Sequence, residues 1–271
     1  MPDIELATGP TIHYVRRGEG EPVLLIQGMS GNHLSWGEPF LTDLERDFDL
    51  VAYDHRGVGR SSSVTDPFAI TDLADDAAAL IAALGWESAH IVGISMGGMV
   101  AQELALRHPE RIRTLTLGCT YSGGEGSALT SSHVANKLAE AMMSGDPDRA
   151  IASMYEVNVS PGYGADQSAY GTFYEMATAL PTPVPVIMLQ MQAIAAHDTF
   201  DRLQDIAAPT LVIHGTVDEM LPYSNAVLIA ARIPGARLVT LEDVGHMFWW
   251  EQPERSAQAI RELALRSEVR G

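Results

Sequence analysis

The stretch that most constrains the fold of this chain is residues 90–100, HIVGISMGGMV. An apolar strand-like run ends at Gly93, a single serine stands at Ser95 between Gly93 and Gly97, and an apolar helical pattern follows. A sharp turn from strand to helix strains the serine backbone and brings neighbouring backbone so close that only glycine fits beside it. The turn exposes the hydroxyl at the carboxyl edge of the sheet, where open α/β folds bind ligands. We therefore expect Ser95 to be a nucleophile.

The rest of the chain alternates between strand-like and helical segments. An opening hairpin is expected from two short β-patterns, and further strands are expected at 22–28, 49–57, 89–95, 113–120, 209–215 and 236–245. Helical patterns fill most of the intervals between these strands and close the chain. This order predicts a mostly parallel, eight-stranded α/β sheet with helices on both faces.

The alternation stops between Tyr121 and Gln204, where a glycine-rich start leads into mostly helical patterns. Because the strand pattern resumes afterwards, the helical stretch interrupts one domain. We predict a core made of residues 1–120 and 205–271, with residues 121–204 forming an inserted helical cap. A second independent domain is the weaker alternative.

Composition narrows the classes of partner. The 17 Lys and Arg against 35 Asp and Glu give a net charge of −18, which argues against binding of nucleic acid. The longest apolar stretch is too short to span a bilayer, and the N-terminus lacks the pattern of a signal peptide. The single cysteine, Cys119, excludes an internal disulfide and is expected to be a small buried core residue. We expect a cytoplasmic protein that binds neither nucleic acid nor membrane; its oligomeric state is left open, a homo-oligomer included.

A serine hydroxyl needs a base, and the base needs an orienting acid. The order Ser, acid, His points to His246, which lies in a glycine-bearing loop between the last strand and the last helix. Asp218 follows an earlier strand and is the preferred acid, because Asp243 is too near His246 in the chain to reach around its ring. We expect the rate to rise with pH around the ordinary histidine pKa of about 6.5.

The tetrahedral intermediate needs two hydrogen-bond donors for its oxyanion. The backbone N–H of Met96 follows the nucleophile directly, and Met29 lies in the loop after an early strand. Among the nine histidines, no pair has the spacing of metal ligands, so we predict neither a metal nor another cofactor.

Together these features resemble the α/β-hydrolase superfamily, and within it the group of esterases, enol-lactonases and cofactor-free haloperoxidases. The resemblance implies the α/β-hydrolase fold, with Ser95, Asp218 and His246 as catalytic triad. DHRGVGRS, residues 54–61, looks like the family's D-x-R-G-x-G-x-S loop, which implies a structural role for Arg56. The chain departs from the family at Gln27, where relatives usually carry histidine.

The favoured function is hydrolysis of carboxylic esters or lactones with mainly apolar acyl groups, through an acyl-enzyme. Enol-lactonase or carbon–carbon bond hydrolase activity in aromatic degradation is an alternative; the latter needs an arginine for a substrate carboxylate, for which Arg149 and Arg202 are the candidates. A lyase of this fold would need a lysine, and Lys137 is the only one. An alternative of another class is a ligand receptor that keeps a hydrolase pocket. Measurement of turnover distinguishes the two, because a receptor would hydrolyse its ligand slowly.

The substrate pocket is expected to be apolar and rich in methionine, which packs adaptably. We expect its lining to include Gly28, Trp36, Met142, Met188, Met191, Met220 and Met247, and Met99, Met143 and Met154 are expected nearby.

Overall fold

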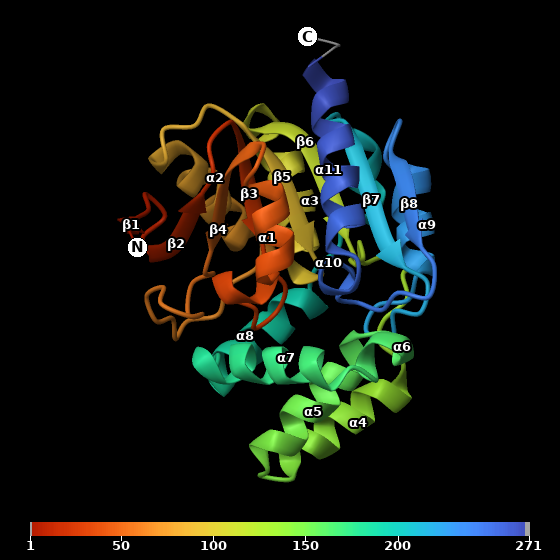
Figure 1. Cartoon of the computed structure of the whole chain (residues 1–271). Coiled ribbons are helices and arrows are strands. Elements are labelled where there is room, and N and C mark those ends of the chain that lie inside the picture. The colour runs from red at the N-terminus through yellow and green to blue at the C-terminus, as the bar shows by residue number, and fades with distance from the viewer. Residues whose placement is uncertain (1, 269–271) are drawn as a thin grey trace.

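The computed structural model describes residues 2–268 of the chain. Within these residues eight strands form one sheet in the order β1-β2-β4-β3-β5-β6-β7-β8 (Figure 1). The β1–β2 and β2–β4 pairs are antiparallel, and all other pairs are parallel. The strands are β1 (Asp3–Glu5), β2 (Thr11–Arg17), β3 (Glu21–Ile26), β4 (Phe48–Tyr53), β5 (Ala89–Ile94), β6 (Ile112–Gly118), β7 (Thr210–Gly215) and β8 (Arg237–Leu241). The predicted mostly parallel, eight-stranded sheet is confirmed.

Helices cover both faces of the sheet (Figure 1). One layer contains α1 (Glu38–Leu44), α10 (Phe248–Glu251) and α11 (Pro253–Glu268). The opposite layer contains α2 (Ile70–Ala83), α3 (Met96–Arg107) and α9 (Ser224–Arg232). Short 3₁₀ helices are η1 (His33–Trp36), η2 (Pro109–Arg111) and η3 (Phe200–Asp205).

The central strands are buried on both faces, and their side chains alternate between two cores. On β3, Leu24 and Ile26 belong to the core beneath α2 and α3, whereas Val23 and Leu25 belong to the core beneath α1 and α11. Successive side chains of a strand point to opposite faces, so a continuous apolar run is what a sheet covered on both sides requires.

Five helices lie between β6 and β7 and form a group beyond the carboxyl ends of the parallel strands (Figure 1). Four of them begin at capping side chains that accept hydrogen bonds from backbone N–H groups of the first turn: Ser131, Asp146, Ser160 and Asp166. This placement puts the helices directly over the edge of the sheet at which Ser95 stands. The helices are α4 (Ser132–Met143), α5 (Pro147–Asn158), α6 (Pro161–Gly164), α7 (Gln167–Ala179) and α8 (Val184–Ala195).

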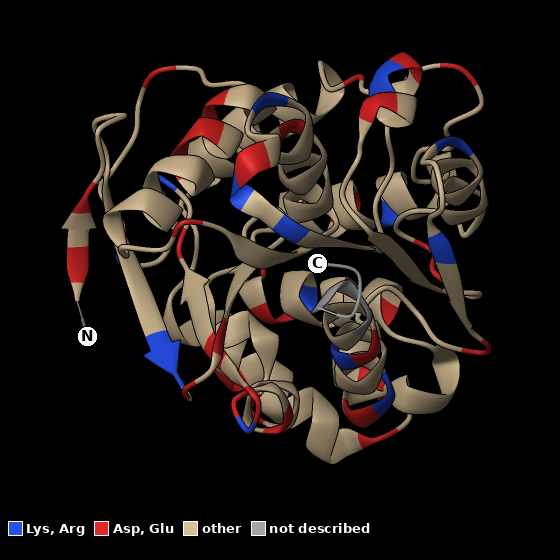
Figure 2. Cartoon of the chain, turned by 90° about the horizontal axis from the view of Figure 1, so that it is seen from above, with Lys and Arg blue, Asp and Glu red and all other residues tan. Residues whose placement is uncertain are grey.

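Charged residues are spread along the chain. Figure 2 shows acidic segments on both helical layers and in the loops, with basic segments interspersed among them. Among the described residues, no helix is both long enough and apolar enough to cross a membrane.

Candidate active site

Ser95 occupies the turn between β5 and α3, and its backbone is strained. Its φ of 52° and ψ of −122° lie outside the regions that residues with a Cβ normally adopt. The turn is held by backbone bonds: Ser95 N donates to Gly118 O at 2.9 Å, and Gly98 N donates to Ser95 O at 2.9 Å. Thr120 Oγ1 donates to the same Ser95 oxygen at 2.7 Å. This is the geometry expected of a nucleophile elbow.

The two glycines beside Ser95 are required by close approach of backbone. A Cβ at Gly97 would collide with the carbonyl oxygen of Ile26, and a Cβ at Gly93 would collide with the carbonyl oxygen of Gly97. Neither obstacle is a flexible side chain, so neither can move aside cheaply. The prediction that only glycine fits at positions 93 and 97 therefore agrees with the structure.

Asp218 and His246 form a buried pair. His246 Nδ1 lies 2.7 Å from Asp218 Oδ2, and His214 Nε2 lies 2.9 Å from the same oxygen. The other carboxylate oxygen accepts hydrogen bonds from the backbone N–H groups of Met220 at 2.8 Å and Leu221 at 2.9 Å. Burial would raise the pKa of Asp218, but its contacts with His246 and His214 outweigh burial and hold the pKa at about 2. The carboxyl group is therefore an anion aimed at the His246 ring.

The same pair changes the expected titration of His246. Burial lowers the pKa of this imidazole, but the Asp218 carboxylate outweighs burial and raises it well above the ordinary value. Cys119 is also within hydrogen-bonding reach of the ring, and burial raises the pKa of its thiol, which stays neutral. The Asp218 carboxylate therefore moves the expected midpoint above the 6.5 of a free imidazole.

Ser95 and His246 line one cavity of about 260 Å³ between the sheet edge and helices α5, α7 and α8. No hydrogen bond joins the Ser95 hydroxyl to His246 in the described part of the chain. Catalytic hydrogen bonds often tighten only when substrate is bound. The structure thus brings the three predicted triad members to one place and joins two of them directly.

The two expected oxyanion donors come from different segments near Ser95. Met96 is the first residue of α3, whose N-terminal N–H groups have no acceptor within the helix. Met29 lines the cavity, in a loop whose Gly28 packs against the Ser95 side chain. Among residues 2–268, neither backbone N–H has an acceptor. Gln27, the departure from the family pattern, accepts a hydrogen bond from Gly28 N at 2.8 Å.

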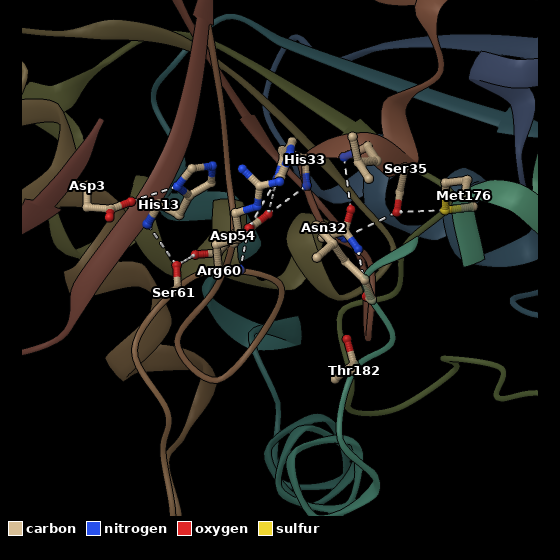
Figure 3. A network of polar contacts seen from close by, with 12 residues as sticks. Asp3, His13, Asn32, His33, Ser35, Asp54, Arg60, Ser61, Met176 and Thr182 are labelled. Carbon is tan, nitrogen blue, oxygen red and sulfur yellow. Dashed lines mark hydrogen bonds and ion pairs between the residues drawn. The ribbon is translucent and has the colours of Figure 1, made fainter. Parts of the chain in front are cut away.

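The loop after β3, which carries Met29 and leads into η1, is supported by Asp54, which follows β4 (Figure 3). Asp54 accepts from His33 N at 2.7 Å and from Arg60 N at 2.9 Å, and it lies 2.9 Å from His33 Nδ1. His13, His33 and Asp54 are buried, with ligating atoms within 4.8 Å of one another, but these hydrogen bonds already occupy both Asp54 oxygens. The cluster therefore reads as a structural support.

Arg56, in the same loop as Asp54, has a structural role of its own. Its guanidinium makes two hydrogen bonds of 2.7 Å to the buried carboxylate of Asp76 on α2. A bidentate pair of this kind fixes the loop against the helix layer. The structural role that the resemblance implied for Arg56 agrees with these contacts.

Only some of the residues that were expected to line a substrate pocket line this cavity. Gly28, Met220 and Met247 line the cavity. Trp36 does not, because it is fully buried in the core beneath α1, with its ring 5.8 Å from Phe40. The prediction is also wrong for three methionines whose side chains face away from the cavity and are each 49% exposed: Met142, Met188 and Met191.

Several lining residues were missed or named only in passing. Phe173, Met176 and Ala177 form one face of α7 at the spacing i, i+3, i+4, which is a helical signal visible in the sequence. Met154 on α5 also lines the cavity, whereas Met143 is 85% exposed and Met99 is buried in the core.

Comparison with known proteins places this site in a family. The model of the alpha/beta hydrolase fold family matches residues 21–253. A protein named "Putative carbamate hydrolase RutD" of Azorhizobium caulinodans is 30% identical over 238 residues, which are 88% of either chain. The chain belongs to the α/β-hydrolase family, and it is a hydrolase.

Solved structures agree over nearly the whole chain. Est816, described as an N-acyl homoserine lactone degrading enzyme, has a TM-score of 0.79 at 30% identity and covers 96% of this chain and 99% of its own. A thermophilic esterase of Thermogutta terrifontis has a TM-score of 0.82 at 26% identity and covers 98% of both chains. The predicted fold and superfamily are confirmed.

Proposed function

We propose that the protein hydrolyses carboxylic esters or lactones with apolar acyl groups, using Ser95 as nucleophile. The observation that carries the proposal is the strained Ser95 elbow in the same cavity as His246, whose ring is oriented by an anionic Asp218. The names of the relatives, a carbamate hydrolase, a lactone-degrading enzyme and an esterase, share acyl transfer from a carbonyl carbon.

The proposed reaction has two halves. The Ser95 oxygen attacks the carbonyl carbon while His246 takes its proton, and the N–H groups of Met29 and Met96 bind the oxyanion. The proton then passes to the leaving alcohol as the carbonyl–oxygen bond breaks, which leaves an acyl group on Ser95. Water repeats the sequence and releases the acid. Asp218 keeps Nδ1 protonated, so that Nε2 is free to accept.

The lining of the cavity favours neutral substrates. No Lys or Arg is among its described lining residues. Lys137 pairs with Glu156 at 2.8 Å, Arg202 pairs with buried Glu103, and Arg149 lies outside the cavity. The carboxylate-binding arginine that a carbon–carbon hydrolase would need is therefore missing from these positions. We propose that residues 121–204 act as a cap that selects the acyl group.

Two measurements test the proposed function. The first is hydrolysis of p-nitrophenyl esters, lactones and aryl carbamates by the wild type and Ser95→Ala, with Ser168→Ala as a control serine on the exposed face of α7. The second is mass spectrometry after treatment with a fluorophosphonate, which should modify Ser95 once. If every ester is hydrolysed no faster than in buffer alone and Ser95 is not labelled, the proposal is rejected and a receptor is favoured. A carbamate as the best substrate would replace the ester.

A further inference from the structure

A second cavity of about 590 Å³ lies beside the site cavity, between β2, β4 and α1 on one side and α7 on the other. Two residues, Met176 and Trp249, line both cavities. The wall between the cavities is therefore about one side chain thick at these positions.

One part of this wall is held more firmly than the other. The Trp249 indole is buried and donates to Ser35 O at 3.0 Å. Met176 is half-buried at the edge of the core beneath α1, and its one hydrogen bond is from Ser35 Oγ to its sulfur at 3.4 Å (Figure 3). A thioether is a weak acceptor, and a methionine side chain has three rotatable bonds. Rotation of Met176 would join the two cavities.

The size and lining of the two cavities indicate which part of a substrate would extend from the site cavity into the larger one. At about 260 Å³ the site cavity is smaller than the roughly 300–1,000 Å³ of ordinary ligand pockets, so a long chain has to extend beyond it. Beyond Met176 the larger cavity is lined by apolar side chains that include Leu34, Leu41 and Trp250. Charged residues line it too: Arg17, which pairs with Glu38 at 2.8 Å, and Arg60 and Glu175. A flexible apolar chain fits the first part of this lining.

We propose that Met176 is a gate, and that the second cavity receives the apolar chain of esters too long for the site cavity. The inference rests on the proposed function and names its substrate class. Each methylene that enters should raise kcat/KM about fourfold, from about 0.8 kcal/mol per buried CH₂.

The test is the ratio of kcat/KM for long-chain esters to that for acetates. One arm uses p-nitrophenyl esters of growing acyl length, and the other uses acetates of growing alcohol length, which distinguishes the two halves of the substrate. In one of the two ester series, the ratio for the wild type should rise with chain length. In that series Met176→Trp should lower the ratio at least tenfold, and Met176→Ala should raise it. Met188→Ala, on the exposed face of α8, is the control. If the wild type hydrolyses acetates but neither variant changes the ratio, the proposed gate is overturned and the proposed function stands. If the wild type hydrolyses no ester, the proposed function itself is rejected.

A different observation concerns the loop that carries Met29. The next residue, Ser30, has a φ of 60°, a left-handed conformation that is uncommon for a residue with a Cβ. Its N–H donates to Gln190 Oε1 at 2.9 Å, and its carbonyl accepts from Thr182 Oγ1 at 2.8 Å. Gln190 lies on α8 and is fully buried, and Thr182 lies in the loop between α7 and α8. Two side chains thus hold both ends of one strained residue.

We infer that Gln190 and Thr182 are positioning residues that hold the Met29 N–H toward the oxyanion, so that this donor is in place only while α7 and α8 cover the site. This inference also rests on the proposed function. The donor acts on the transition state rather than on the bound ester, so loosening it should lower kcat and leave KM nearly unchanged.

The variants are Gln190→Ala and Thr182→Val, with Gln192→Ala on the exposed side of α8 as control. We expect kcat to fall about tenfold to a hundredfold, less than the loss of a whole oxyanion donor. The affinity for a trifluoromethyl ketone, which forms the oxyanion, should fall by the same factor, and Thr182→Ser should restore both. A lower melting temperature with unchanged kcat, or an equal loss of affinity for a ketone without the fluorines, would overturn the inference. Lack of activity in the wild type would instead reject the proposed function.

Discussion

Replacement of Asp218 by asparagine tests the centre of the proposed mechanism. The side chain keeps its size but loses the charge that faces His246 Nδ1 at 2.7 Å. Two unit charges about 4 Å apart at an effective dielectric constant of about 20 interact with about 4 kcal/mol, or about a thousandfold in rate. An asparagine amide can also donate to Nδ1 and stabilise the tautomer whose Nε2 cannot accept a proton. We therefore expect kcat to fall by about 10³ to 10⁴.

The variant should also change the pH dependence. In the wild type the neutral imidazole is the base and its pKa is raised, so kcat/KM should rise with pH with a midpoint above about 6.5. In Asp218→Asn the carboxylate that raises this pKa is gone, while burial, which lowers it, remains. The midpoint should therefore move to lower pH in the variant.

The assay is stopped-flow hydrolysis of an activated acetate between acidic and alkaline pH, with circular dichroism to confirm folding. Asp243→Asn is the matched control, because Asp243 is exposed and its left-handed backbone, with φ 58°, suits asparagine. If Asp243→Asn loses more activity than Asp218→Asn, or if Asp218→Asn keeps the midpoint of the wild type, Asp218 does not orient the base.

Three further predictions concern support and selectivity. Asp54→Ala should lower the free energy of unfolding in urea by at least about 3 kcal/mol, because it removes the acceptor of two backbone N–H groups and of a buried histidine. Gly97→Ala should lower it by at least about 2 kcal/mol, because the new methyl group meets backbone, whereas Gly162→Ala, with open space around it, should change little. Met154→Ala should shift the preference among acyl lengths by about tenfold in kcat/KM, whereas Met143→Ala at an exposed position should leave the profile as in the wild type.

The sequence predicts the sheet and the reactive residues because both depend on short-range rules. A buried strand that ends in a serine between two glycines can adopt few backbone conformations, and Ser95, Asp218 and His246 follow the ends of β5, β7 and β8. By contrast, α6 and α10 are single turns of four residues, too short to show a helical period. The pKa of His246 could not be predicted either, because it depends on burial and on the approach of one carboxylate.

The pocket was predicted poorly because it depends on how each cap helix is rotated. Helix α8 reads VPVIMLQMQAIA and is apolar nearly all round, so hydrophobicity does not say which side faces inward. In the structure Met188 and Met191 face outward, while Gln190 is fully buried. A buried amide is costly unless it is hydrogen-bonded; Gln190 Oε1 accepts from Ser30 N, whereas its amide nitrogen has no partner among the described residues. The inward side of α8 is thus the side that carries the polar Gln190, and this hydrogen bond joins α8 to the loop after β3 that carries Met29.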